Sequence, residues 1–317
     1  MLSEDSAGEY WDVRARLQGG AYFFARFWVT NEGPGSHTGI AMGSFLDADG
    51  TRSDFRYGRE RSEWTLAGAG RYLEIASAVL DLRPPVGRVE LDTNRQGIKI
   101  YLRFPIEDAP RVPCARRDEA GGFDLLALAA PIDGVAWTKD MAAPLAASGT
   151  IDVTHGWSTR SEIDNVHRRI EITARDDDVA VYASVLVAPT GERRTCTTVV
   201  RDDTVVYESR NAVARASTTA LDDDDMPYPI PERIRLSDDH LQLTVEPQRR
   251  LLRINPLTIV PQPFRFLLGL RSRPMRSWSD GTWHLRLTRA IGNAPLDLSG
   301  HTVTAVSYTN PWPAEGR

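Results

Sequence analysis

The chain has 317 residues, of which 41% are apolar and 26% charged, values close to globular averages that exclude a disordered or fibrous protein. A formal net charge of -5 and a sequence pI near 5.8 supply no attraction for phosphates, so no nucleic-acid partner is expected. The acidic start, MLSEDSAGEYWD, lacks a secretory pattern, and no apolar run approaches the roughly 18 residues of a membrane helix. We therefore expect a cytoplasmic protein with no transmembrane segment.

Alternation of apolar and polar residues dominates the first half of the chain. Its clearest case is residues 98–104, IKIYLRF, where four apolar side chains share one face of a predicted strand. Turn signals such as Asp49-Gly50 and Pro84-Pro85 separate strands of this kind. Residues 140–149, DMAAPLAASG, are rich in small side chains and lie near the middle of the chain. The sequence thus predicts two domains, residues 1–145 and 146–317.

The segment GTIDVTHGWSTRSEID, residues 149–164, carries the most information about a site. If it is extended, Ile151, Val153, His155 and Trp157 share one face. His155 would then be a hydrogen-bond donor or a general acid or base inside a dry pocket. The alternative is a core histidine that a neighbouring carbonyl satisfies. Arg160 has the opposite parity and joins this face only if the chain turns just before it.

The second half of the chain repeats the strand pattern. Residues 179–187, 241–245 and 283–287 each present one apolar face, whereas residues 211–220 are expected to form a short helical turn or a loop. In residues 166–175, VHRRIEITAR, His167 and Glu171 are expected to face outward. Arg168 falls in register with the buried residues, so it either snorkels to solvent or guards a pocket mouth. Many short strands with frequent turns indicate a barrel or a sandwich.

Motifs for cofactors and metals are missing from the chain. No G-x-G-x-x-G, Walker, H-E-x-x-H or G-x-S-x-G sequence occurs, and none of the six histidines pairs with another at metal-ligand spacing. We therefore expect no cofactor and no metal. Cys114 and Cys196 lack a C-x-x-C arrangement and are expected to be reduced structural thiols.

Eight tryptophans are many for a chain with only 8% aromatic residues. A single tryptophan in a β protein belongs more often to the core than to a ligand site. Together they fit a barrel that holds an apolar guest, so the expected partner is a small hydrophobic molecule. We predict His155 as the catalytic residue and a substrate-binding pocket lined by Trp28, Tyr57, Trp64, Trp137, Trp157, Arg160 and Tyr182.

Two stretches carry a resemblance to a known family. Residues 8–50 place an aromatic-rich strand before a strand that ends in an acidic-Gly turn, and residues 153–163, VTHGWSTRSEI, are similar to a DHEWS or DHNWG signature. In these features the chain resembles the two-barrel lipocalin-like proteins, which include carotenoid 1,2-hydratases, AttH-like proteins and fungal decalin-forming Diels-Alderases. His155, Trp157 and Ser158 match the signature. Thr154 and Gly156 depart from it, so the acid role of the family's aspartate is not carried over.

The resemblance implies an all-β fold of two tandem lipocalin-like antiparallel β-barrels. It also implies a cofactor-independent cyclase (a pericyclase for Diels-Alder-type cycloaddition or related ring formation or rearrangement) in secondary metabolism. Its substrate would be a hydrophobic polyene, polyketide or terpenoid, folded against aromatic walls while one carbonyl is polarised. His155 and Trp157 carry over as pocket or domain-junction residues. Two alternatives stay open: a carrier of hydrophobic ligands, and a lyase like carotenoid 1,2-hydratase.

Overall fold

The computed structural model describes residues 8–31, 37–93, 95–107, 112–118, 121–159, 166–176, 178–202, 204–221, 228–259, 265–266, 269, 272–289 and 295–309, with only the backbone for 112–118, 218–221 and 259. Nearly all elements within these residues are strands, which confirms the predicted all-β class. The chain divides into two compact units, Met1–Ser161 and Glu162–Arg317. No helix in the described part is long and apolar enough to cross a membrane.

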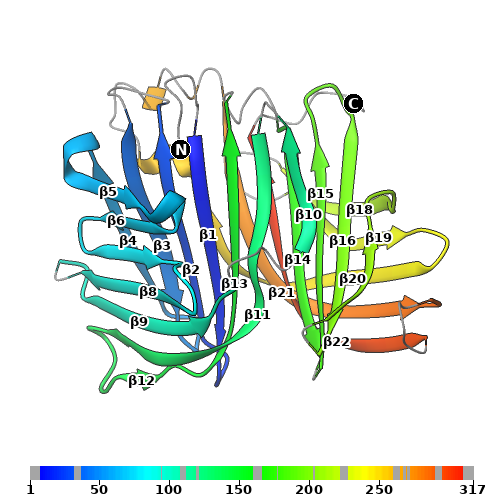
Figure 1. The fold of residues 1–317 in the computed structure, drawn as a ribbon, viewed down its shortest axis with the longest axis horizontal. Coiled ribbons are helices and arrows are strands. Elements are labelled where there is room, and N and C mark those ends of the chain that lie inside the picture. Colours follow the sequence, from blue (N-terminus) through cyan, green and yellow to red (C-terminus); the bar gives the residue numbers. More distant parts are fainter. Residues whose placement is uncertain are drawn as a thin grey trace. The chain divides into compact units, whose positions relative to one another are not determined.

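The first unit is one antiparallel sheet that curls into a nearly closed barrel of 11 strands (Figure 1). The strand order is β4-β3-β2-β1-β13-β11-β9-β8-β7-β6-β5, and β10 and β12 pair with β11 beside this path. The strands and 3₁₀ helices are β1 (Gly8–Leu17), β2 (Tyr22–Thr30), β3 (Thr38–Leu46), β4 (Arg52–Arg59), η1 (Arg61–Glu63), β5 (Trp64–Ala67), η2 (Gly68–Gly70), β6 (Tyr72–Ile75), β7 (Ala78–Asp81), β8 (Val86–Thr93), β9 (Ile98–Pro105), β10 (Val112–Asp118), β11 (Gly121–Thr138), β12 (Leu145–Ala146) and β13 (Gly149–Ser158).

The division between the units differs from the one expected at 145/146. Strand β13 was assigned to the second barrel, but it pairs with β1 along its whole length and with β11 on its other side. The first unit accordingly extends to Ser161. The small-residue segment before β13 is therefore a connection within the first unit.

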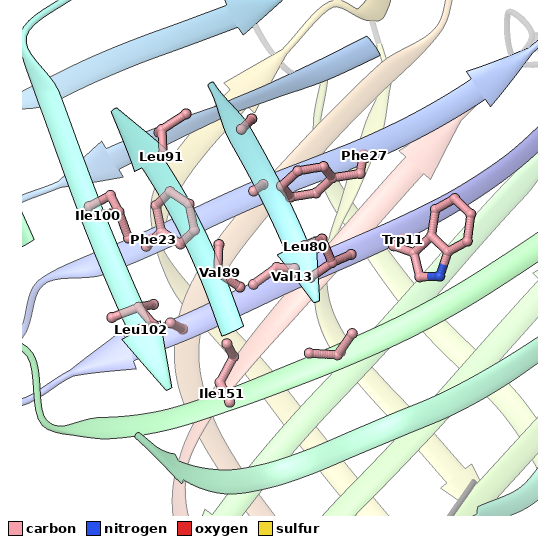
Figure 2. Packing of buried hydrophobic residues seen from close by; sticks show 14 of the residues in the cluster. Trp11, Val13, Phe23, Phe27, Leu80, Val89, Leu91, Ile100, Leu102 and Ile151 are labelled. Carbon is pink, nitrogen blue, oxygen red and sulfur yellow. The ribbon is translucent and has the colours of Figure 1, made fainter. Parts of the chain in front are cut away.

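The inward-facing side chains of the first unit fill its barrel with one apolar cluster. In β9 the predicted face, Ile98 to Phe104, is buried, while Lys99, Tyr101 and Arg103 are exposed. In β1 the odd-numbered residues from Trp11 to Leu17 belong to the same cluster. Figure 2 shows the side chains of facing strands meeting there, with Trp11 at one end of the group. Burial of this apolar area is the main stabilising contribution of the unit.

The second unit is a nine-stranded antiparallel sheet curled into a half-barrel, in the order β17-β16-β15-β14-β22-β21-β20-β19-β18. Its apolar cluster contains the predicted faces of residues 241–245 and 283–287, and Val179, Val181, Ala183 and Val185 from residues 179–187. The elements are β14 (Arg168–Asp176), β15 (Val179–Val187), β16 (Arg193–Arg201), β17 (Thr204–Ser209), β18 (Val213–Leu221), β19 (Pro229–Ser237), β20 (Leu241–Ile254), η3 (Pro256–Ile259), β21 (Met275–Leu287) and β22 (Leu296–Tyr308).

Three local predictions in the second unit are wrong. The helical turn or loop expected at residues 211–220 is the edge strand β18, whose small residues pair with β19. His167 and Glu171 are buried rather than exposed, and Arg276 Nη2 lies 3.3 Å from a Glu171 carboxylate oxygen. Cys196 is disulfide-bonded and not a free thiol. The side chain of Cys114 lies outside the described residues.

An ion pair at the end of β7 gives a pH-dependent contribution to stability. Side-chain hydrogen bonds from Arg83, and a weaker one from Arg88, lower the pKa of the buried Asp81 from 3.8 to about 2. A folded-state pKa below the unfolded value stabilises the fold above the unfolded pKa, and this contribution is lost as the pH falls from 3.8 through about 2. We expect Asp81→Asn to lower the free energy of unfolding by about 2 kcal/mol at pH 7.

Urea denaturation of both proteins across acidic pH measures this effect. The difference in the free energy of unfolding between the two proteins should shrink as the pH falls from 3.8 through about 2. Asp92→Asn is the control, because Asp92 pairs with Lys99 at 3.2 Å in an exposed position, and exposed pairs contribute no more than about 1 kcal/mol. A difference for Asp81→Asn that does not change with pH would contradict the assignment.

Candidate functional site

Strand register brings polar and aromatic side chains together at one end of the inner face of the first barrel. One cross-strand row runs from Trp157 on β13 through Glu9 on β1 to Val29 on β2. The next row runs from His155 through Trp11 to Phe27 on the same strands, and on β11 Asp124 pairs with His155. We call Glu9, Trp11, Asp124, His155 and Trp157 the His155 cluster.

His155 lies between two buried carboxylates. Its Nε2 is 2.8 Å from Glu9 Oε1, a hydrogen-bond distance, and its Nδ1 is 4.0 Å from Asp124 Oδ2, which is too long for a direct bond. The side chains of Glu9 and Asp124 are 8% and 6% exposed, whereas that of His155 is 17% exposed. The imidazole is thus held by Glu9 on one side and remains within reach of a molecule from solvent.

Two tryptophans flank the imidazole ring. Trp11 stacks on it with ring centroids 4.7 Å apart and planes 12° apart, and Trp157 lies 5.1 Å away at 31°. Trp157 can occupy this place because Gly122 faces it; a Cβ atom on Gly122 would lie 1.8 Å from the indole. Gly70, with a φ of +84°, brings the chain close to Glu9 and Trp11. The two indole rings therefore surround the imidazole with apolar surface, and Glu9 and Asp124 place carboxylates beside it.

This arrangement suits proton handling or carbonyl polarisation. An imidazole oriented by a carboxylate can donate a hydrogen bond or transfer a proton, and both effects are stronger in a surrounding of low dielectric constant. A second carboxylate, that of Asp124, lies 4.0 Å from the other ring nitrogen and adds negative charge beside the imidazole. Among the described residues no three His, Cys, Asp or Glu side chains are placed to hold a metal ion.

Two other predicted site residues share the inner face of the first barrel. Tyr57 on β4 pairs with Ala41, which belongs to the same cross-strand row as His155. The Tyr57 hydroxyl accepts a hydrogen bond from Ser77 Oγ at 2.9 Å. The indole of Trp64 packs on Gly39, in the row of Glu9, and donates to the His37 carbonyl at 2.8 Å. Tyr57 lies on β4 and Trp64 on β5, the two strands at the opposite ends of the strand order.

The remaining predicted residues do not join the His155 cluster. Trp28 lies on the face of β2 opposite the buried Phe27 and Val29, and Trp137 lies on the outer face of β11 beside Lys99. Tyr182 is fully buried but belongs to the second unit, where its hydroxyl donates to Glu171 Oε1 at 3.4 Å. Arg160 lies outside the described residues.

Three members of the cluster were absent from the predicted site: Glu9, Trp11 and Asp124. For β1 a signal was available, because the alternation that buries Val13, Ala15 and Leu17 also turns Trp11 and Glu9 inward. An acidic residue on an otherwise apolar face indicates a site. For Asp124 no such signal existed, because register shifts on β11 after Leu125 break the alternation.

Each of the two β units is an antiparallel sheet curled around its own apolar cluster. This is a lipocalin-like fold with two units. No family model and no curated protein matches the sequence. Among solved structures, the fold is similar to an AttH-type protein from Nitrosomonas europaea, with 12% identity, a TM-score of 0.64, and coverage of 96% of this chain and 93% of that chain. This finding confirms the resemblance to the AttH-like proteins at the level of the fold.

Two further solved structures share the fold. CghA, crystallised with Sch210972, is 13% identical with a TM-score of 0.62, covering 97% of this chain and 89% of that chain. Kievitone hydratase from Nectria haematococca is 8% identical with a TM-score of 0.58, covering 96% and 90%. At these identities the comparison establishes the fold, and the chemistry depends on the residues of this chain.

Proposed function

We propose that this protein is a cofactor-independent cyclase that binds a hydrophobic polyene, polyketide or terpenoid at the His155 cluster and promotes ring formation or rearrangement. The observation that carries the proposal is the imidazole held 2.8 Å from Glu9 between two tryptophan rings. The partly exposed Trp157 supplies an apolar surface for an extended unsaturated chain, and the buried Trp11 stacks on the imidazole and fixes its orientation. The imidazole supplies one oriented polar group that can polarise a carbonyl.

Two effects available to this site, positioning and one hydrogen bond, can lower the free-energy barrier of such a reaction. Holding reacting carbons at near-attack distance contributes up to roughly 7–11 kcal/mol. An oriented hydrogen-bond donor contributes about 3–4 kcal/mol when charge develops on the oxygen it contacts. Shape and one donor therefore account for a large acceleration. The crystal structure of CghA with Sch210972 supports the proposal that this fold can bind a small molecule.

A second candidate is a lyase that adds water to a carbon-carbon double bond. The observation that favours it is the pair of carboxylates, Glu9 and Asp124, on opposite sides of His155. Hydration needs a proton donor for one carbon and a base for the attacking water, and these three side chains can divide the two roles. They also replace, from other strands, the aspartate that Thr154 displaces from the family signature. Kievitone hydratase, which shares the fold, supports this reading.

One incubation separates these proposals from that of a carrier. The purified protein is mixed with a linear polyene that bears a tetramate or tetronate head, and the products are analysed by chromatography and mass spectrometry. A product of unchanged mass and new retention time supports the cyclase, and a gain of one water supports the lyase. Return of the substrate unchanged, with saturable binding, supports the carrier and contradicts both enzymes. Heat-denatured protein is the control for the uncatalysed reaction.

A further inference from the structure

The contact between Glu9 and His155 determines which ring nitrogen carries the proton. His155 Nε2 lies 2.8 Å from Glu9 Oε1, and the Glu9 side chain is only 8% exposed. An ionised carboxylate accepts hydrogen bonds and donates none, so the nitrogen that faces it carries hydrogen. A neutral imidazole has a single N–H group. Glu9 therefore favours the tautomer with hydrogen on Nε2 and the lone pair on Nδ1.

Asp124 is the second carboxylate that could set the tautomer, by accepting a hydrogen bond from Nδ1. Its Oδ2 lies 4.0 Å from that nitrogen, which is beyond hydrogen-bond distance. The contact with Glu9 is at hydrogen-bond distance and is the stronger of the two. Glu9 thus occupies Nε2, and Nδ1 is the nitrogen left for a bound molecule.

Packing holds the imidazole in this orientation. Trp11 is 1% exposed and stacks on the ring, with centroids 4.7 Å apart and planes 12° apart. Gly70 keeps the space beside the carboxylate open, because a Cβ atom there would lie 3.4 Å from Glu9 Oε1. A ring backed by a buried indole and bonded to a buried carboxylate cannot turn about its Cβ–Cγ bond without losing the hydrogen bond. The two nitrogens therefore keep separate roles.

We propose that Glu9 is a positioning residue that holds His155 in the Nε2–H tautomer, and that Nδ1 is the nitrogen that meets the substrate. Only the second part rests on the proposed function, because the tautomer exists without substrate. Neutral Nδ1 takes a proton from an O–H group of the substrate or of water. The O–H bond breaks, its electron pair stays on oxygen, and an Nδ1–H bond forms. The resulting imidazolium donates from the same atom, and the Glu9 carboxylate stabilises its charge.

Nitrogen NMR of the full chain, labelled with nitrogen-15 in its histidines, tests the tautomer without substrate. At a pH of about 8.5, well above the ordinary histidine pKa of about 6.5, His155 should carry hydrogen on Nε2 and none on Nδ1. The signals that disappear in His155→Ala identify this residue among the six histidines. Glu9→Gln should turn the single tautomer into a mixture, because a glutamine amide can accept from Nε2–H or donate to a bare Nε2.

Two further variants locate the effect. Asp124→Asn should leave the hydrogen of His155 on Nε2. Asp297→Asn removes the carboxylate from an exposed pair in which His284 Nε2 lies 2.7 Å from Asp297 Oδ1, and it should leave the His155 signals unchanged. In the unsubstituted protein, hydrogen on Nδ1 or on both nitrogens would overturn the proposal, even if Glu9→Gln did not fold. A single unchanged tautomer in Glu9→Gln, or a change in Asp124→Asn alone, would also overturn it.

Kinetics test the second part. With a substrate that the protein converts, Glu9→Gln should lower kcat about 10- to 100-fold and change KM little, because the imidazole remains but spends less time in the required tautomer. In the His155→Ala background, Glu9→Gln should cause no further loss, because no ring is left to position. Full kcat in Glu9→Gln would overturn the role of Glu9. Absence of any conversion by the unsubstituted protein would contradict the proposed function and leave the tautomer result standing.

Discussion

Replacement of His155 by alanine is expected to lower kcat for ring formation by about 100- to 1,000-fold and to change KM little. The reason is that the imidazole acts on charge that develops only in the transition state, whereas the apolar surface of Trp157 binds the substrate in both states. Steady-state kinetics with the converted polyene measure both constants. His284→Gln is a matched control, because His284 Nε2 lies 2.7 Å from Asp297 Oδ1 in an exposed pair of the second unit.

His155→Gln separates the two candidate reactions. A glutamine amide can donate a hydrogen bond to Glu9 or to a substrate carbonyl but cannot transfer a proton at neutral pH. For a cyclase that needs only a donor, we expect glutamine to recover part of the activity lost in the alanine variant. For a lyase, glutamine and alanine should be equally inactive. Thermal melts must accompany the kinetics. If each variant loses activity only in proportion to the fraction of protein that is unfolded, His155 is a core histidine and not a catalytic residue.

The sequence predicted the strands of this protein better than its site. Period-two alternation in residues 98–104 and 179–187 reports burial directly, because one face of each strand meets an apolar interior. The same rule correctly placed His155 and Trp157 on one face with Ile151 and Val153. It could not place β13 in the right unit, because alternation says nothing about the neighbouring strand.

The partners of His155 could not be predicted for the same reason. Glu9 lies 146 residues from His155 in the sequence and reaches it only through the antiparallel pairing of β1 with β13. Asp124 reaches it through β11, where two register shifts hide the inward face from a parity argument. Trp28 and Trp137 were predicted for the pocket from aromatic density. The structure places both on the outer face of the first barrel, away from the His155 cluster.

Trp11→Ala is expected to lower the free energy of unfolding of the first unit by about 3–5 kcal/mol, the range for removing a buried aromatic side chain. Trp11 is 1% exposed and belongs to the apolar cluster of the barrel (Figure 2). It also stacks on His155, and such ring contacts add about 0.5–1.5 kcal/mol beyond the buried area. Urea denaturation, with comparison of the midpoints and slopes of the two proteins, measures the loss.

The control for this prediction is the same substitution at Trp137. Its indole lies on the outer face of β11 and is partly exposed, so truncation removes contacts without leaving an enclosed cavity and should cost well under half as much. Trp11→Phe should recover more than half of the loss, because a phenyl ring refills most of the space. If Trp11→Ala cost no more than Trp137→Ala, the end of the barrel would not be closed by packing on Trp11. His155 would then lack the rigid wall that its proposed role in orienting a substrate requires.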